Sequence, residues 1–220
     1  MSNDDGAARW LLVHDDLLRG LVHDVSNCVA TISAVAFMLD GSQPPDERVL
    51  QGLRTDAERL EGLLRALRQL PQGGDAGLEP LLVGDVIAQA CQLHAHHPDF
   101  RMRAVRVEVP DGVVPVLADS TALLHAVCLA LVAAMRTGDR LASDTLDVVV
   151  GAETVGDVVR LRIAADAPSG RAVAVEWVDE LDRDRAAITW LLATSHGTTR
   201  PHPFGCELLL PTLQAARRRA

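Results

Sequence analysis

Residues 11–39, LLVHDDLLRGLVHDVSNCVATISAVAFML, carry the pattern that decides the fold. Mainly apolar positions recur there in alternating steps of three and four, which is the heptad repeat of a long amphipathic helix. The repeat consists of Leu11, His14, Leu18, Leu21, Val25, Cys28, Ile32, Val35 and Leu39. A further apolar column beside it consists of Val22, Val29 and Ala36. This stripe is wider than one neighbouring helix can cover, so we expect the helix to belong to a bundle.

A second helix is expected to follow closely. Residues 41–45, GSQPP, interrupt the first helix, and Asp46 begins the next one. The same spacing then recurs at Leu50, Leu53, Ala57, Leu60, Leu64 and Leu67. The short break predicts an antiparallel hairpin, which leaves one apolar face uncovered. Pairing two copies into a four-helix bundle would bury that face, so the sequence predicts a homodimer.

A second domain follows a break in the pattern. Residues 71–77, PQGGDAG, have the composition of a linker, which predicts a helical domain at 1–72 and another domain at 78–220. The second domain mixes helical and β-branched segments. We expect helices at 83–95, 120–135 and 184–195 and strands at 104–109, 113–117, 146–152, 158–164 and 206–210. The predicted fold class is therefore α+β: a helical hairpin that forms a dimeric four-helix bundle, followed by an α/β sandwich.

Composition excludes several classes of partner. With 220 residues and 48% hydrophobic residues, the chain is expected to be globular. A net charge of -9 argues against a nucleic-acid partner. The N-terminus lacks the order of a signal peptide, and the longest nearly apolar stretch, 123–135, is too short to cross a bilayer. Four scattered cysteines fit a reducing compartment. We expect a cytoplasmic protein without a membrane or nucleic-acid partner.

His23 is the main candidate for chemistry. It lies two residues after Leu21, which turns it away from the apolar seam and toward water. Asp24 could accept the proton of one ring nitrogen and leave the other nitrogen free to attack phosphorus. Arg19 and Asn27 lie one turn to either side, where Arg19 could offset charge and Asn27 could bind the transferred group or orient water. On spacing alone, an ordinary polar surface histidine is the favoured interpretation of His23.

The string His23-Asp24-Val25-Ser26-Asn27 resembles the phosphoacceptor box of bacterial sensor histidine kinases. That box holds a histidine, an acidic residue, two variable residues and a polar Asn or Thr. Residues 56–60, DAERL, leading to Leu70, resemble the second helix of the kinase dimerisation and phosphoacceptor domain. The resemblance covers residues 7–70. It implies that His23 is the phosphoacceptor, supported by Asp24 and Asn27, with Arg19 and Ser26 in contact with the phosphoryl group or a partner.

A second tripeptide, Val13-His14-Asp15, repeats the pattern of Val22-His23-Asp24. Nine helical residues turn by about 900°, which places the two histidines on opposite faces. Because His14 occupies a seam position, we expect it to be a buried or hydrogen-bonded core histidine. Residues 94–97, HAHH, with Asp99 nearby, could form a metal site, because imidazole is the commonest ligand of transition metals. The favoured interpretation is a polar helix end that places cations near the negative pole of the helix dipole.

The second domain resembles the kinase ATP-binding domain in its order of elements, with specific departures. Leu129 and Ala133 stand where the family has metal-linked asparagines. Residues 166–170, DAPSG, resemble the adenine-contacting box but place proline where the first glycine belongs. Residues 179–184, DELDRD, replace the glycine-rich loop before the next helix with four acids that would repel a triphosphate. The sequence predicts a degenerate ATPase-like domain that does not bind ATP.

This combination resembles the bacterial histidine phosphotransferases of phosphorelays, which are dimeric, kinase-shaped and independent of ATP. The resemblance implies that His23 relays a phosphoryl group between the aspartates of response regulator receiver domains. The protein would need no cofactor, because Mg²⁺ is expected on the partner response regulator. Two alternatives stay open: a response regulator phosphatase in which Asn27 positions water, and a non-enzymatic dimeric adaptor or pseudokinase. A divergent active kinase is disfavoured by the missing asparagines and glycine loop.

Overall fold

The structure is a computed structural model that describes residues 3–38, 46–70, 77–100, 103–141, 147–167 and 175–218. The predicted turn at 41–45 lies outside these residues. The predicted linker also lies outside them, except for Gly77.

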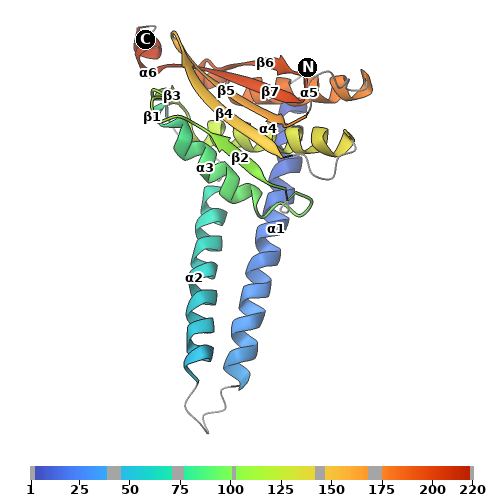
Figure 1. Cartoon of the computed structure of the whole chain (residues 1–220), viewed down its shortest axis with the longest axis vertical. Coiled ribbons are helices and arrows are strands. Elements are labelled where there is room, and N and C mark those ends of the chain that lie inside the picture. Colours follow the sequence, from blue (N-terminus) through green and yellow to red (C-terminus); the bar gives the residue numbers. More distant parts are fainter. Residues whose placement is uncertain are drawn as a thin grey trace.

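Two long helices form the predicted antiparallel hairpin. They are α1 (Asn3–Met38) and α2 (Glu47–Gln69), and the Asp46 side chain caps α2 by accepting a hydrogen bond from the Arg48 backbone N–H. Figure 1 shows that the far half of the hairpin extends away from the rest of the protein. The near half of α1 continues upward beside the second domain. The hairpin is therefore only partly a separate unit.

The buried positions of the hairpin differ from the predicted seam. In the first half of α1 the buried line runs through Trp10, Val13, Leu17 and Leu21, while Leu11 is 55% exposed. On α2, Leu63 is buried and Leu64 is 43% exposed. The predicted register was wrong for the first half of α1 because this segment packs against α4 and α5 of the second domain rather than against α2.

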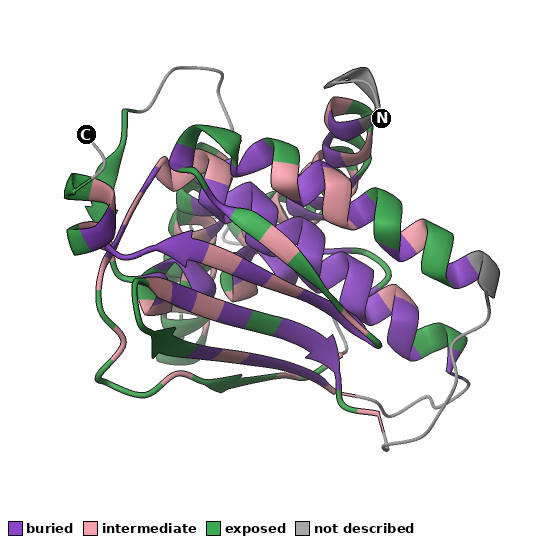
Figure 2. Ribbon diagram, turned by 90° about the horizontal axis from the view of Figure 1, so that it is seen from above, coloured by how far each residue is buried: buried purple, intermediate pink, exposed green. Residues whose placement is uncertain are grey.

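The second domain is built on a five-stranded sheet. Its strands are β2 (Val105–Glu108), β4 (Val148–Val155), β5 (Val158–Ala165), β7 (Gly205–Pro211) and β6 (Thr198–His202), in that spatial order. β2 runs parallel to β4, and the other neighbours are antiparallel. A separate pair joins β1 (Glu79–Leu81) to β3 (Val116–Ala118). The helices α3 (Val83–His94), α4 (Ser120–Arg140) and α5 (Val175–Leu191) cover one face of the larger sheet (Figure 2). A 3₁₀ turn (Ala193–Ser195) and the short α6 (Leu213–Arg217) complete the described elements.

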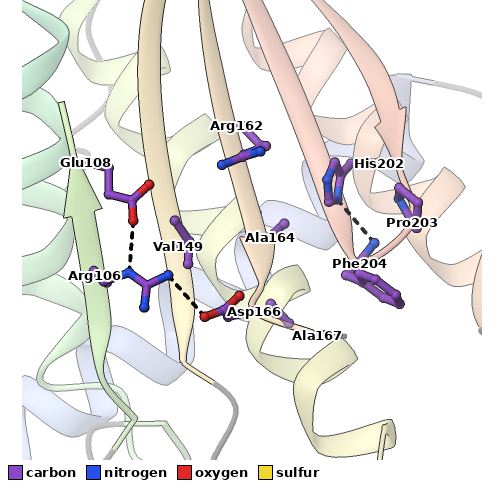
Figure 3. A pocket seen from close by; sticks show the side chains of 11 residues that line it. Arg106, Glu108, Val149, Arg162, Ala164, Asp166, Ala167, His202, Pro203 and Phe204 are labelled. Carbon is purple, nitrogen blue, oxygen red and sulfur yellow. Dashed lines mark hydrogen bonds and ion pairs between the residues drawn. The ribbon is translucent and has the colours of Figure 1, made fainter. Parts of the chain in front are cut away.

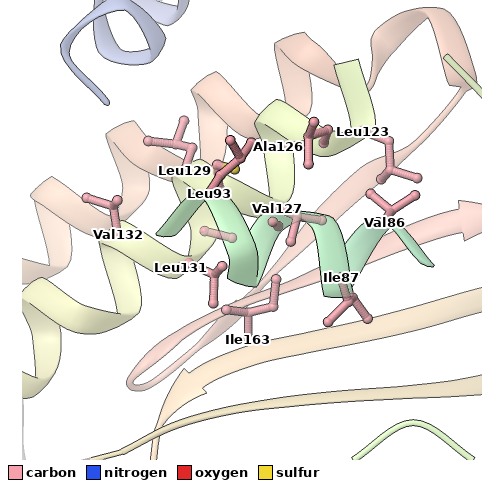
Figure 4. Packing of buried hydrophobic residues seen from close by; sticks show 14 of the residues in the cluster. Val86, Ile87, Leu93, Leu123, Ala126, Val127, Leu129, Leu131, Val132 and Ile163 are labelled. Atoms are coloured by element: carbon pink, nitrogen blue, oxygen red, sulfur yellow. The ribbon is translucent and has the colours of Figure 1, made fainter. Parts of the chain in front are cut away.

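Helix α4 is the core of this domain. Asp119 caps it, with its carboxylate accepting a 2.8 Å hydrogen bond from the Ala122 N–H. Every residue from Leu123 to Met135 is buried, so α4 is apolar all round, as expected for a helix surrounded by other elements. Figure 4 shows its side chains packed against Val86 and Ile87 of α3 and near Ile163 of β5.

Two of the described helices have the length and hydropathy that could cross a membrane, Gly6–Met38 and Ser120–Arg140. The expectation that the apolar stretch 123–135 is too short to cross a bilayer was therefore wrong, because the helix that contains it, α4, continues to Arg140. In α4 the apolar composition has another explanation, since 83% of the window is buried inside the protein. The corresponding window of α1 is only 11% buried, so this helix keeps much apolar surface exposed.

The predicted fold class is confirmed for one chain: a helical hairpin followed by an α/β sandwich with helices on one face of a mixed sheet. The pairing of two hairpins into a bundle stays a prediction. The edge strand β6 was missed because TTRPH has neither an alternating apolar pattern nor a proline-free run. Helix α5 begins at Val175 rather than near 184, so residues 179–184 are helical and do not form a loop.

The contact at Gly20 predicts an unusual response to mutation. A Cβ atom on Gly20 would lie 1.6 Å from the His96 carbonyl oxygen, whereas a Cβ on Gly52 of α2 would meet nothing within 4 Å. We expect Gly20→Ala to lower the free energy of unfolding by about 1 to 3 kcal/mol, because α1 must move away from the second domain. We expect the control, Gly52→Ala, to raise it by up to about 1 kcal/mol through helix propensity. Urea denaturation measures both, and equal stabilisation by the two substitutions would contradict the close approach.

A buried histidine predicts a loss of stability in acid. His125 of α4 stacks on Trp10 of α1 with ring centroids 3.9 Å apart, and burial lowers its pKa from 6.5 to about 3. Between these values the unfolded chain binds a proton that the folded protein excludes, so this contribution is complete above pH 6.5 and declines as the pH falls toward 3.

We therefore expect His125→Phe to reduce the acid sensitivity of unfolding by about 1.4 kcal/mol per pH unit between pH 6 and 4. Urea denaturation at several pH values measures this slope. Asp184 works in the opposite direction, because burial raises its pKa to about 6, and it stays unchanged in the variant. An identical slope in the two proteins would contradict the assignment to His125.

Candidate functional site

His23 lies exposed on α1, and the next residue, Asp24, contacts the second domain. Asn27, one turn later, places its amide nitrogen Nδ2 3.1 Å from His23 Nε2. An amide nitrogen is a donor, so Nε2 is the acceptor in this contact and the neutral ring carries its proton on Nδ1. The lone pair on Nε2 is the electron pair that attack on phosphorus requires. Asn27 thus selects the nucleophilic tautomer.

The Asp24 carboxylate is hydrogen-bonded to the second domain and not to the neighbouring His23 ring. Its Oδ2 accepts a 2.8 Å hydrogen bond from Nδ1 of His96, which follows α3 in the second domain. Successive side chains on a helix point about 100° apart, so Asp24 faces the second domain while His23 faces solvent. The expected pairing of Asp24 with the His23 ring is therefore wrong for this structure. Sequence reasoning missed His96 as a partner because 72 residues separate the two positions.

Arg19 and Ser26 also make other contacts. Arg19 donates a 3.0 Å hydrogen bond to Asp16 on the same helix, and Ser26 donates one of 2.8 Å to the Val22 carbonyl. Both residues are exposed and both lie within about one turn of His23. Their predicted contact with a phosphoryl group or a partner stays a prediction.

The histidines after α3 have different environments. His94 and His97 are buried, and burial lowers the pKa of both, that of His94 to about 4. The two rings pack with Phe100, whose centroid lies 4.7 Å from that of His97. The interpretation as a cationic helix end was wrong, because these imidazoles are neutral core groups near pH 7. Within the described ranges, no group of three or more metal-binding side chains lies together.

His14 is partly buried rather than fully buried, and its Nδ1 lies 3.5 Å from the Asp15 carboxylate, so of the two expected states the hydrogen-bonded one is found. Its ring contacts Trp10 edge-on at 6.0 Å between centroids, and its side chain is 21% exposed. The reason is again that this half of α1 packs on the second domain through Trp10 and Val13 rather than through the predicted seam.

The face of α4 that carries Ala133 is filled by a side chain from α5. Trp177 packs against Ala133 and Leu181, and its indole N–H donates a 3.1 Å hydrogen bond to Thr137. The Arg140 guanidinium lies over the ring, 5.0 Å from its centroid. Leu129, the other position expected to carry an amide, is also buried. This part of the helix thus offers apolar and aromatic packing in place of the expected amide groups.

The acidic run of α5 binds α1. Asp184 accepts a 2.9 Å hydrogen bond from Arg9, and Glu180 pairs with the same guanidinium. Glu180 and Asp184 therefore face α1 within the helix layer and do not line an open cleft. Asp166, from the DAPSG box, pairs with Arg106 of β2 at 3.0 Å, while residues 168–170 lie outside the described part of the chain.

A hollow of about 500 Å³ lies on the open face of the sheet (Figure 3). Its charged and aromatic lining consists of Arg106, Glu108, Arg162, Asp166, His202 and Phe204. Arg162 makes no ion pair with any other described residue, whereas Arg106 is held by Glu108 and Asp166. Sequence reasoning missed this hollow, although the alternation of VVRLRIAA in β5 already places Arg160 and Arg162 on one face. The hollow lies opposite the helix layer and is separate from the His23 site.

Comparison with known proteins gives a likeness of fold only. No family model matches the chain, and no curated protein matches it. Among solved structures, the Acinetobacter baumannii histidine kinase AdeS shares 18% identity at a TM-score of 0.48, covering 87% of this chain and 98% of its own. A mycobacterial sensor histidine kinase, MprB, shares 18% identity at a TM-score of 0.41, covering 62% and 98% respectively. The histidine kinase ThkA, in complex with the response regulator TrrA, shares 14% identity at 0.44, covering 92% and 63%. At these values the similarity identifies no activity for this chain.

Proposed function

We propose that the protein is a histidine phosphotransferase of two-component signalling, with response regulator receiver domains as its partners. The observation that carries this proposal is the exposed His23 ring. Its Nε2 accepts a 3.1 Å hydrogen bond from the Asn27 amide nitrogen, so Nε2 carries a lone pair and no proton. The ring is exposed on a helix that the second domain contacts at the next residue, Asp24, and the Asn27 amide must move aside when Nε2 attacks. The phosphoacceptor-like box from His23 to Asn27 supports the same assignment.

The reaction needs only groups that the two proteins supply. Nε2 of His23 attacks the phosphorus of a receiver aspartyl phosphate, the P–O bond to the aspartate breaks, and the aspartate leaves as a carboxylate. A second receiver aspartate then attacks the phosphohistidine, the P–N bond breaks, and its electron pair returns to Nε2. Mg²⁺ in the acidic pocket of the receiver would offset the charge of the phosphoryl oxygens.

Independence from ATP is supported by the packing between α4 and α5. Trp177 occupies the space beside Ala133, and Leu129 is buried in the core. A magnesium–triphosphate group needs carboxylate or amide ligands, which these two positions do not offer. The proposed transferase therefore receives its phosphoryl group from another protein and holds no cofactor of its own.

A homodimer is supported by the apolar surface of the hairpin. Exposed apolar side chains on α1 and α2 include Val22, Val29, Phe37, Met38 and Leu64. Val22 and Val29 are seven residues apart, so they lie on one face of α1. A contiguous apolar face of this kind on a helical hairpin favours pairing with a second copy in a four-helix bundle.

The decisive test is transfer from a radiolabelled, phosphorylated response regulator of the same organism to the purified full chain. We expect label on the wild-type protein and none on His23→Ala, because Nε2 of His23 forms the P–N bond. The matched control is His14→Ala, which removes the histidine of the related tripeptide and is expected to keep the label. A further sample receives labelled ATP alone and is expected to remain unlabelled.

The other results select the alternatives. Release of label as free phosphate, lost in Asn27→Ala but retained in His23→Ala, would favour the phosphatase. Labelling of His23 by ATP would establish an active kinase. Binding of a regulator without any transfer would leave the adaptor or pseudokinase.

The dimer proposal predicts the effect of one charge in the hairpin. We expect Val29→Glu to shift the mass in solution from about twice 23.6 kDa to the monomer value, because a buried carboxylate in the bundle lacks a partner. Light scattering coupled to size-exclusion chromatography measures this mass. Gln92→Glu, which adds the same charge at an exposed site on α3, is the control and should remain dimeric. A wild-type monomer would refute the proposal.

A further inference from the structure

One face of α1 docks onto the segment that follows α3. Asp16, Gly20 and Asp24 are spaced four residues apart and therefore lie on the same side of the helix. Opposite them, His97 Nε2 lies 3.9 Å from Asp16, the His96 carbonyl lies against Gly20, and the His96 ring binds Asp24. Both the backbone and the ring of His96 are thus fixed against the phosphoacceptor helix.

The Asp24–His96 pair is the main polar link in this contact. Its hydrogen bond is 2.8 Å long, and the side chains are 14% and 23% exposed. The neighbouring Asp16–His97 contact is longer, and burial lowers the pKa of His97, so its ring is neutral and attracts Asp16 only weakly. Arg19, on the same helix, is bound to Asp16 and makes no described contact with Asp24. Asp24 is therefore held by His96.

Two imidazole rings can use the same carboxylate. With Asn27 at Nε2, the neutral His23 ring carries its proton on Nδ1, and a carboxylate that accepted this proton would make Nε2 a better nucleophile. Asp24 is the carboxylate next to His23 in the chain. It is bound to the Nδ1–H of His96, so the His23 ring lacks this acceptor in the structure described.

We propose that His96 is a positioning residue that holds Asp24 away from His23 and so limits the reactivity of the phosphoacceptor. This inference rests on the proposed function. The close contact between Gly20 and the His96 carbonyl involves neither the Asp24 side chain nor the His96 ring, so breaking their hydrogen bond leaves this backbone contact of α1 in place. The exchange replaces one imidazole N–H donor to Asp24 by another, and we expect a partner that docks beside His23 to shift it.

Three substitutions test the role of His96 in transfer. His96→Ala frees Asp24 and should raise the rate of phosphoryl transfer to His23 several-fold. Asp24→Asn should slow transfer, and adding His96→Ala to it should then have no further effect, because the two residues act through one hydrogen bond. Asp16→Asn loosens the same interface without touching Asp24 and should leave the rate unchanged. Slower transfer in His96→Ala, or equal acceleration in Asp16→Asn, would overturn the proposal.

A second measurement does not depend on transfer. Nitrogen-15 NMR of the histidine rings reports whether His23 Nδ1–H is bound to a carboxylate. In His96→Ala we expect this proton to exchange more slowly with water and to shift downfield, and we expect both changes to disappear in the double variant with Asp24→Asn. An unchanged His23 signal in His96→Ala would refute the restraint. If the wild-type protein accepts no phosphoryl group but the signal changes as expected, the proposed function fails while the contact of Asp24 stands.

Discussion

The packing of the first half of α1 on the second domain decides where the candidate residues face. Trp10, Val13, Leu17 and Leu21 are buried in the same core as α4. Burying four side chains of this size contributes several kcal/mol, so the rotation of α1 about its axis is strongly fixed. In the structure described, this rotation turns His23 toward solvent and brings Asp24 within hydrogen-bond distance of the segment after α3.

The same packing joins two parts that the sequence suggested were separate. The salt bridges of Arg9 to Glu180 and Asp184, the Trp10–His125 stack and the Asp24–His96 hydrogen bond all connect α1 to the second domain. These contacts come from positions 9, 10 and 24 of α1, so they join the first two thirds of the helix to the second domain. A fixed contact of this kind would suit the proposed transferase, which receives its phosphoryl group from another protein.

An aromatic side chain, Trp177, fills the space between α4 and α5 beside Ala133. Trp177 packs against Ala133, donates a hydrogen bond to Thr137 and makes a cation–π contact with Arg140. These three interactions together fix its position. Figure 2 shows the helix layer on one side of the sheet. The charged hollow with Arg162 lies on the other side, and no residue of α1 lines it.

The sequence by itself determined the helical hairpin, the order of most strands and helices, and the exposure of His23. These features depend on periodicity and on residues within a few positions of one another, which a linear pattern records. It could not give the register of the first half of α1, because apolar residues lie on more than one face of the helix there and only packing on the second domain selects the face with Val13 and Leu17. It also could not give the start of α5, since two acids of residues 179–184, Glu180 and Asp184, bind Arg9, which lies 171 and 175 positions away. Only the tertiary structure decided that Asp24 binds His96 rather than His23, because that choice depends on a backbone approach at Gly20 that brings distant segments together.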